Sequence, residues 1–169
     1  MTLLDAPQFD AARSRRNTLI VECCAVTLVV LFVVWWLVAG RPVDWPWNWN
    51  HYLFGRAAVN KFLTAVEAND LPKAYGIWLN DKNWQQHPQQ YTTYPFSRFE
   101  GDWGPNSPDN EYGAIHSHKI VLAGHYGKKG VLVAVLINGR KSDALNLAYD
   151  YRTGTLDFSP PGVSLYLGP

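Results

Sequence analysis

The stretch "KKGVLVAVLINGRKSDALNLAYDY", Lys128 to Tyr151, decides the fold class because two apolar runs flank an Asn-Gly pair. The first run, Val131 to Ile137, is apolar on both faces, which is typical of a central strand. The second run, Leu145 to Tyr151, alternates and predicts a strand with one buried face. Asn138-Gly139 is the strongest hairpin signal in the chain. This stretch therefore predicts two antiparallel strands within one sheet.

One further strand is predicted on each side of this stretch. "AIHSHKIVLAGHYG", Ala114 to Gly127, precedes it, and "TLDFSP", Thr155 to Pro160, follows it. Both segments are rich in branched or aromatic residues and end at turn residues. Gly127 to Gly130 and Thr153-Gly154 supply tight reversals, and such short connections make neighbouring strands antiparallel. We expect four consecutive strands in a meander.

Helical periodicity dominates the region before the strands. A helix is predicted from Tyr52 to Ala68, and Asp70 can cap a second helix that tolerates Pro72 in its first turn. A third, shorter helix is predicted from Pro95 to Gly101. The residues expected to face the core are Val59, Phe62, Leu63, Val66, Ala74, Tyr75, Trp78 and Leu79. Helices followed by a meander predict an α+β domain, with about three helices on one face of a curved four-stranded antiparallel sheet.

A long apolar segment precedes this domain. "LIVECCAVTLVVLFVVWWLVA", Leu19 to Ala39, contains a single charge, Glu22, near its start. As a helix it would reach roughly 32 Å, against about 30 Å for the hydrocarbon core of a bilayer. A cleaved signal peptide is the alternative, since Val38 to Gly40 offers small residues for cleavage. Signal cores are usually about 7 to 15 apolar residues, so the length favours a retained transmembrane helix.

Charge sets the expected orientation and excludes one class of partner. Three basic residues precede the segment and only Arg41 follows it closely, which predicts a cytoplasmic N-terminus. The three are Arg13, Arg15 and Arg16. The remaining 12 Lys and Arg residues nearly balance the 11 Asp and Glu residues that follow the segment. We therefore expect no nucleic-acid partner. Cys23 and Cys24 both lie in the segment, so no disulfide is expected in the outer domain.

Tryptophans cluster around the exit from the apolar segment. Five of them are predicted to form an interfacial belt at the lipid headgroups: Trp35, Trp36, Trp45, Trp47 and Trp49. The alternative is that some dock on a partner's transmembrane helix or on the outer domain itself. The expected layout is a cytoplasmic tail at 1–18, a transmembrane helix at 19–39, an aromatic linker at 40–51 and an extracytoplasmic domain at 52–169.

The outer domain resembles the nuclear transport factor 2-like superfamily. The resemblance is based on "VNKFLTAVEANDLPKAY", Val59 to Tyr75, which looks like its opening helix pair, and on Lys128 to Tyr151, which looks like its long central strands. It covers roughly Asn50 to Phe158 and implies a cone of three helices packed on a bent antiparallel sheet. Superfamily members include isomerases, dehydratases, secretion-system parts and binding modules, so the fold alone selects no function. Oxidase-assembly and translocase-accessory proteins are similar in layout.

The resemblance implies that an enzyme of this fold would use an acid or base and a hydrogen-bond donor in the cone. His116 and His118 are expected to share one strand face through their i, i+2 spacing and could join His125 in binding a metal. No cysteine, and no acidic residue within three positions of the pair, supplies a further ligand. We therefore predict no metal, no cofactor and no catalytic residue.

Aromatic residues crowd the stretch "YTTYPFSRFEGDWG", Tyr91 to Gly104. Some would pack the third helix, and the others could line the mouth of the cone or anchor a partner. The candidate partner or pocket surface comprises Tyr91, Tyr94, Phe99, Trp103, His116 and His118. The closing "SPPGVSLYLGP" is expected to cross the sheet edge or to reach a neighbouring subunit, which would make a homodimer.

These patterns favour a noncatalytic interaction or assembly module, held by one membrane span and acting as an accessory subunit of a membrane protein complex. The expected location is a bacterial inner membrane with the domain in the periplasm. Expected partners are the lipid bilayer and a membrane or periplasmic protein. A tethered domain that binds or senses a small ligand is the first alternative, and a cryptic isomerase or hydrolase is the second.

Overall fold

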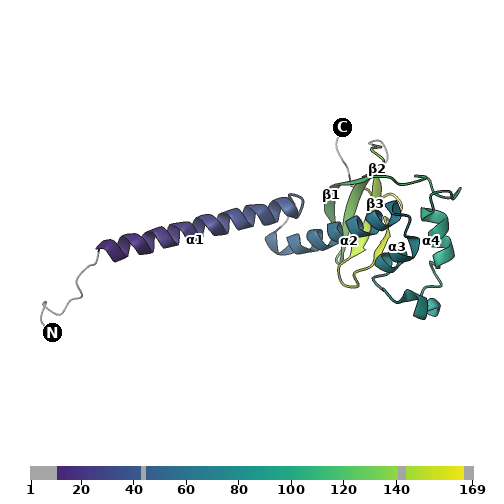
Figure 1. Ribbon diagram of the computed structural model, residues 1–169, viewed down its shortest axis with the longest axis horizontal. Helices are drawn as coiled ribbons and strands as arrows, with labels where there is room; N and C mark the ends of the chain where they lie inside the picture. The colour runs from purple at the N-terminus through teal and green to yellow at the C-terminus, as the bar shows by residue number, and fades with distance from the viewer. Residues whose placement is uncertain (1–10, 43–44, 141–143, 166–169) are drawn as a thin grey trace, which may run out of the picture. The chain divides into compact units, whose positions relative to one another are not determined.

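A computed structural model describes residues 11–42, 45–140 and 144–165 of the chain. Two compact units make up the protein, Met1–Val38 and Ala39–Pro169. The first contains one long helix, and the second contains short helices and a sheet (Figure 1).

The first unit is formed by α1 (Ala11–Val38), an apolar helix of 28 residues with no buried residue. It is long and apolar enough to cross a membrane, and an 18-residue window within it has a mean hydropathy of 2.5. The helix begins before the predicted Leu19 and so includes the arginines that precede the apolar segment. Within it, the Thr27 hydroxyl donates to the Cys23 carbonyl oxygen, 2.8 Å away. This bond satisfies the one hydroxyl in the middle of the apolar segment.

The described part of the second unit has three α-helices, and the first of them follows directly after a 3-10 turn that begins with a proline, η2 (Pro46–Asn48). They are α2 (Trp49–Glu67), α3 (Leu71–Trp78) and α4 (Phe96–Trp103), with short turns η3 (Trp84–Gln86) and η4 (Pro88–Gln90) between the last two. The Asp70 side chain accepts a hydrogen bond from the Lys73 N–H at 3.2 Å, which confirms the predicted cap. The third helix forms close to its predicted place.

The sheet contains β1 (His118–Tyr126), β2 (Gly130–Ile137), β3 (Leu145–Asp150) and β4 (Leu156–Phe158). All neighbours are antiparallel, and the spatial order β1-β2-β3-β4 is the predicted meander. After β2, Asn138 and Gly139 have φ angles of 51° and 72° and form the predicted tight turn, in which the Arg140 N–H donates to the Ile137 carbonyl oxygen at 2.9 Å. Because Val135 pairs with Leu145, the connection between β2 and β3 is longer than a two-residue hairpin loop. The α+β class and the four-stranded antiparallel sheet are thus confirmed.

The core lies between α2 and one face of the sheet. Helix α2 contacts β1, β2 and β3, and its predicted stripe is fully buried together with Val133 and Leu147. Gly55 permits the close approach, because a Cβ there would lie 3.3 Å from both Tyr149 and Val131. A register shift between Ile120 and Leu122 reverses the alternation along β1. It leaves His118 on the side of the sheet that faces α2.

The opposite face of the sheet meets the C-terminal segment. A Cβ at Gly124 would lie 2.7 Å from the Leu165 side chain, so the absence of a side chain at Gly124 makes room for Leu165. The Leu165 N–H donates to Asn146 Oδ1 at 3.2 Å. Leu165 therefore lies against the face of the sheet opposite α2, where it contacts Gly124 of β1 and Asn146 of β3.

Candidate functional site

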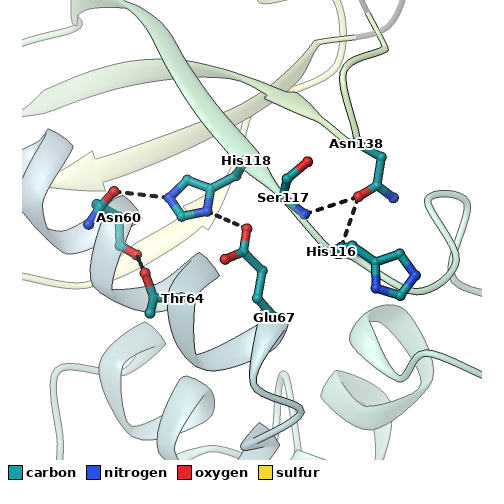
Figure 2. A network of polar contacts seen from close by, with 7 residues as sticks. All are labelled: Asn60, Thr64, Glu67, His116, Ser117, His118 and Asn138. Atoms are coloured by element: carbon teal, nitrogen blue, oxygen red, sulfur yellow. Dashed lines mark hydrogen bonds and ion pairs between the residues drawn. The ribbon is translucent and has the colours of Figure 1, made fainter.

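His118 is held between two polar side chains of α2 (Figure 2). Its Nδ1 atom lies 2.6 Å from Glu67 Oε1, and its Nε2 atom lies 2.9 Å from Asn60 Oδ1. The Thr64 hydroxyl donates to the Asn60 carbonyl oxygen at 2.8 Å. Asn60, Thr64 and Glu67 are four and three positions apart and so lie on one face of the helix. Only 9% of the His118 side chain is exposed.

These two contacts fix the orientation of the His118 imidazole. A histidine acting as a general base needs one ring nitrogen directed at substrate. In His118 both ring nitrogens contact side chains of α2, so neither is directed at a substrate. The contacts instead link the beginning of β1 to α2.

His116 belongs to a different set of contacts. It is exposed, and its backbone N–H donates to Asn138 Oδ1 at 2.8 Å. The N–H of Ser117 donates to the same oxygen at 3.2 Å. Figure 2 shows the His116 ring directed away from His118. His116 lies before β1, so the side-chain alternation of a strand does not apply to it, and the expected shared face of the pair is wrong. Among the residues that the structure describes, no group of three metal-binding side chains occurs.

Two aromatic residues of the predicted partner surface are core residues instead. Phe99 and Trp103 are almost fully buried, and the Trp103 ring centroid lies 4.8 Å from that of Phe62. The prediction that they contact a partner is therefore wrong, because both side chains pack between α4 and the helices α2 and α3. Tyr91 and Tyr94 are only partly exposed.

The tyrosine hydroxyls of this region bind neighbouring oxygen atoms. Tyr75 donates to the Tyr94 carbonyl oxygen at 2.6 Å, and Tyr94 donates to Asp102 Oδ2 at 2.7 Å. Burial, followed by the hydrogen bond to Asp102, raises the pKa of Tyr94 well above its ordinary value. These phenols are therefore protonated hydrogen-bond donors at neutral pH, and they hold the segment before α4 in place.

Asp81 organises the turn after α3. Its Oδ2 atom accepts the Tyr91 hydroxyl at 2.8 Å and lies 3.0 Å from His87 Nδ1, and its Oδ1 atom accepts the Asn83 N–H at 2.8 Å. The hydrogen bonds from His87, Tyr91 and Asn83 lower the pKa of Asp81. The carboxylate is thus ionised and fully occupied by partners within the turn.

The five tryptophans of the predicted belt have different environments. Trp49 is buried in the second unit, which corrects its assignment to a membrane interface. Trp45 and Trp47 are both 68% exposed and stack on each other, with centroids 5.0 Å apart and ring planes 4° apart. Trp35 and Trp36 are partly exposed on α1. Phe54, on α2, is a further exposed aromatic residue that the sequence reasoning did not single out.

A groove of about 690 Å³ lies between α2, α3, the turn that follows α3 and the connection between β3 and β4. None of the candidate site residues predicted from the sequence lines it. Its basic lining residues are Lys61, Lys73 and Lys82, and its larger apolar ones are Phe54, Ile77 and Trp84. Their wide separation along the chain explains why no local motif indicated the groove.

No family model matches the chain, and neither a curated protein nor a solved structure gives a match.

Proposed function

We propose that this protein is a single-pass membrane protein whose C-terminal unit is a noncatalytic interaction module, an accessory subunit of a membrane protein complex. The module has the nuclear transport factor 2-like fold that the sequence resembles. It lies on the periplasmic side of a bacterial inner membrane, and the N-terminus lies in the cytoplasm.

The observation that supports the proposal most directly is the exposed, stacked pair Trp45 and Trp47, just before α2. An aromatic side chain can bury about 150 to 250 Å². At roughly 25 cal/mol per Å², the 68% of each indole that remains exposed forgoes up to about 2.5 to 4 kcal/mol of hydrophobic stabilisation. Contact with a protein partner would recover much of this free energy. Indoles at interfaces commonly supply such anchors.

The polar contacts support a noncatalytic role. The imidazole of His118 and the carboxylate of Asp81 each have several partners inside the domain. Groups that are held in this way stabilise the fold and are not directed at a substrate. The exposed Trp45 and Trp47 supply aromatic surface, which favours binding over chemistry.

Protease accessibility tests the topology. A chain with an epitope tag at each end is expressed in bacteria, and spheroplasts are treated with protease. We expect the C-terminal tag to be lost and the N-terminal tag to be protected until the membrane is lysed. Protection of the C-terminal tag in intact spheroplasts would contradict the proposed orientation.

Site-specific photocrosslinking tests the interaction surface. Benzoylphenylalanine replaces Trp47 in the full chain in living cells, with the same substitution at the exposed loop residue Glu111 as the matched control. We expect a discrete protein adduct from position 47 and none from position 111. Adducts to lipid alone at position 47 would show that the indole pair contacts the membrane and would overturn its role as a partner surface.

A further inference from the structure

We propose that the groove between α2 and α3 binds a single-chain anionic amphiphile, such as a long-chain carboxylate. The proposal goes beyond the interaction function and needs no protein partner. The volume of the groove, about 690 Å³, falls within the range of small-ligand sites, about 300 to 1,000 Å³.

The charge of the groove comes from three lysines on three different elements. Lys61 lies on α2, Lys73 on α3 and Lys82 in the turn that follows α3. No ion pair within 4.0 Å joins any of these three ammonium groups to a carboxylate of the residues that the structure describes. No acidic side chain is among the described residues that line the groove.

The two acids nearest in sequence form no ion pair with these lysines. Asp70 Oδ1 accepts the Lys73 backbone N–H as the cap of α3. Asp81 is occupied by Tyr91, His87 and Asn83. Three unpaired ammonium groups around one concave surface favour an anion, because a bound negative charge is attracted by all of them at once.

Part of the groove lining is apolar and accommodates a hydrocarbon chain. It includes Ala57, Ala58 and Ile77, together with Phe54, which has 60% of its surface exposed. The small side chains of the two alanines leave room for a ligand against α2. Burying the Phe54 ring against an alkyl chain would recover hydrophobic free energy that exposure forgoes. An anion without an apolar chain would leave this surface in water.

The walls of the groove are fixed before any ligand binds. The Trp84 indole N–H donates to the Pro72 carbonyl oxygen at 3.1 Å, and the Trp84 ring packs on Phe96 with centroids 4.9 Å apart. At another point of the lining, the Asn80 side-chain amide donates to the Thr153 carbonyl oxygen at 2.9 Å. A preformed site avoids much of the entropic cost of ordering its residues on binding.

Photolabelling of the full-length protein tests the proposal. The protein is reconstituted in nanodiscs of zwitterionic phosphatidylcholine, and a diazirine analogue of hexadecanoate is added and irradiated. We expect labelled peptides to include Phe54, Ile77 or Trp84, and we expect competition by hexadecanoate and not by hexadecanol. Labelling confined to α1, or equal competition by the alcohol, would overturn the proposal.

The lysines are tested by two triple variants of equal charge. Lys61→Gln, Lys73→Gln and Lys82→Gln together remove the groove charges, whereas Lys119→Gln, Lys128→Gln and Lys129→Gln remove three exposed charges elsewhere. The extent of photolabelling of the groove variant should fall by about tenfold or more, and the control should be labelled to the same extent as the native chain. Equal labelling of both folded variants, compared by their thermal melts, would contradict the proposal. Because the nanodiscs contain no partner protein, this result is independent of the Trp47 crosslinking outcome.

Discussion

The Nδ1 atom of His118 lies 2.6 Å from Oε1 of Glu67, although 51 positions separate the two residues in sequence. Glu67 is the last residue of α2, where the negative end of the helix dipole disfavours a carboxylate. A hydrogen-bond donor from His118 offsets this disadvantage. The pair thus links the end of α2 to the beginning of β1.

Replacing His118 with alanine is expected to destabilise the domain by about 1 to 3 kcal/mol, because a largely buried imidazole and its hydrogen bonds to Glu67 and Asn60 are lost. His116→Ala is the matched control and should change the free energy of unfolding by no more than about 0.5 kcal/mol, since the His116 side chain is exposed. Thermal melts of the full-length protein in detergent measure both. Equal effects of the two substitutions would show that the His118 network contributes no specific stability.

Local features of the sequence were sufficient to predict the helices and strands. The spacing of Val59, Phe62 and Val66 places them on one buried face of α2, and Asn138-Gly139 forms its turn, because periodicity and turn chemistry act between near neighbours. The candidate site could not be predicted in this way. Glu67 lies 51 positions before His118, and only the packing of α2 on β1 brings the two together.

Burial of individual aromatic residues was equally beyond local reasoning. Phe99 and Trp45 look alike in sequence as aromatic residues near prolines, yet one is fully buried and the other is 68% exposed. The difference depends on which face of α4 meets α2 and α3. The groove depends on the same packing, since Lys61, Lys73 and Lys82 converge only when their elements are assembled.

Phe99→Ala should destabilise the second unit by about 3 to 5 kcal/mol, because removing a fully buried ring leaves a cavity among other aromatic side chains. Phe54→Ala removes an exposed ring and should have little effect on the same measurement. Intrinsic fluorescence during urea unfolding of the full chain reports both. A Phe99→Ala variant as stable as the native protein would contradict the burial of Phe99 in the core.

The pKa of Tyr94 predicts a loss of stability at alkaline pH. Because burial and Asp102 raise this pKa above that of an unfolded tyrosine, near 10, the stabilisation is fully present below about pH 10 and is lost as the pH rises toward the folded value. Tyr94→Phe should therefore reduce the fall in melting temperature between about pH 9.5 and 11. Identical pH profiles for the two proteins would contradict the assignment. Absorbance at 295 nm should also show a tyrosine that ionises only on unfolding.

Asn138 contributes to stability through both its backbone conformation and its side chain. Its φ angle of 51° disfavours alanine, its Oδ1 atom accepts the N–H groups of His116 and Ser117, and its Nδ2 group donates to the Ala114 carbonyl oxygen at 2.9 Å. Asn138→Gly keeps the conformation and loses the hydrogen bonds, whereas Asn138→Ala loses both. We expect both variants to be less stable than the native chain, with alanine worse than glycine by about 1 kcal/mol. Urea unfolding of the full-length variants measures the difference. If the glycine variant unfolds like the native protein, the side-chain bonds that tie the segment before β1 to the end of β2 contribute nothing to stability.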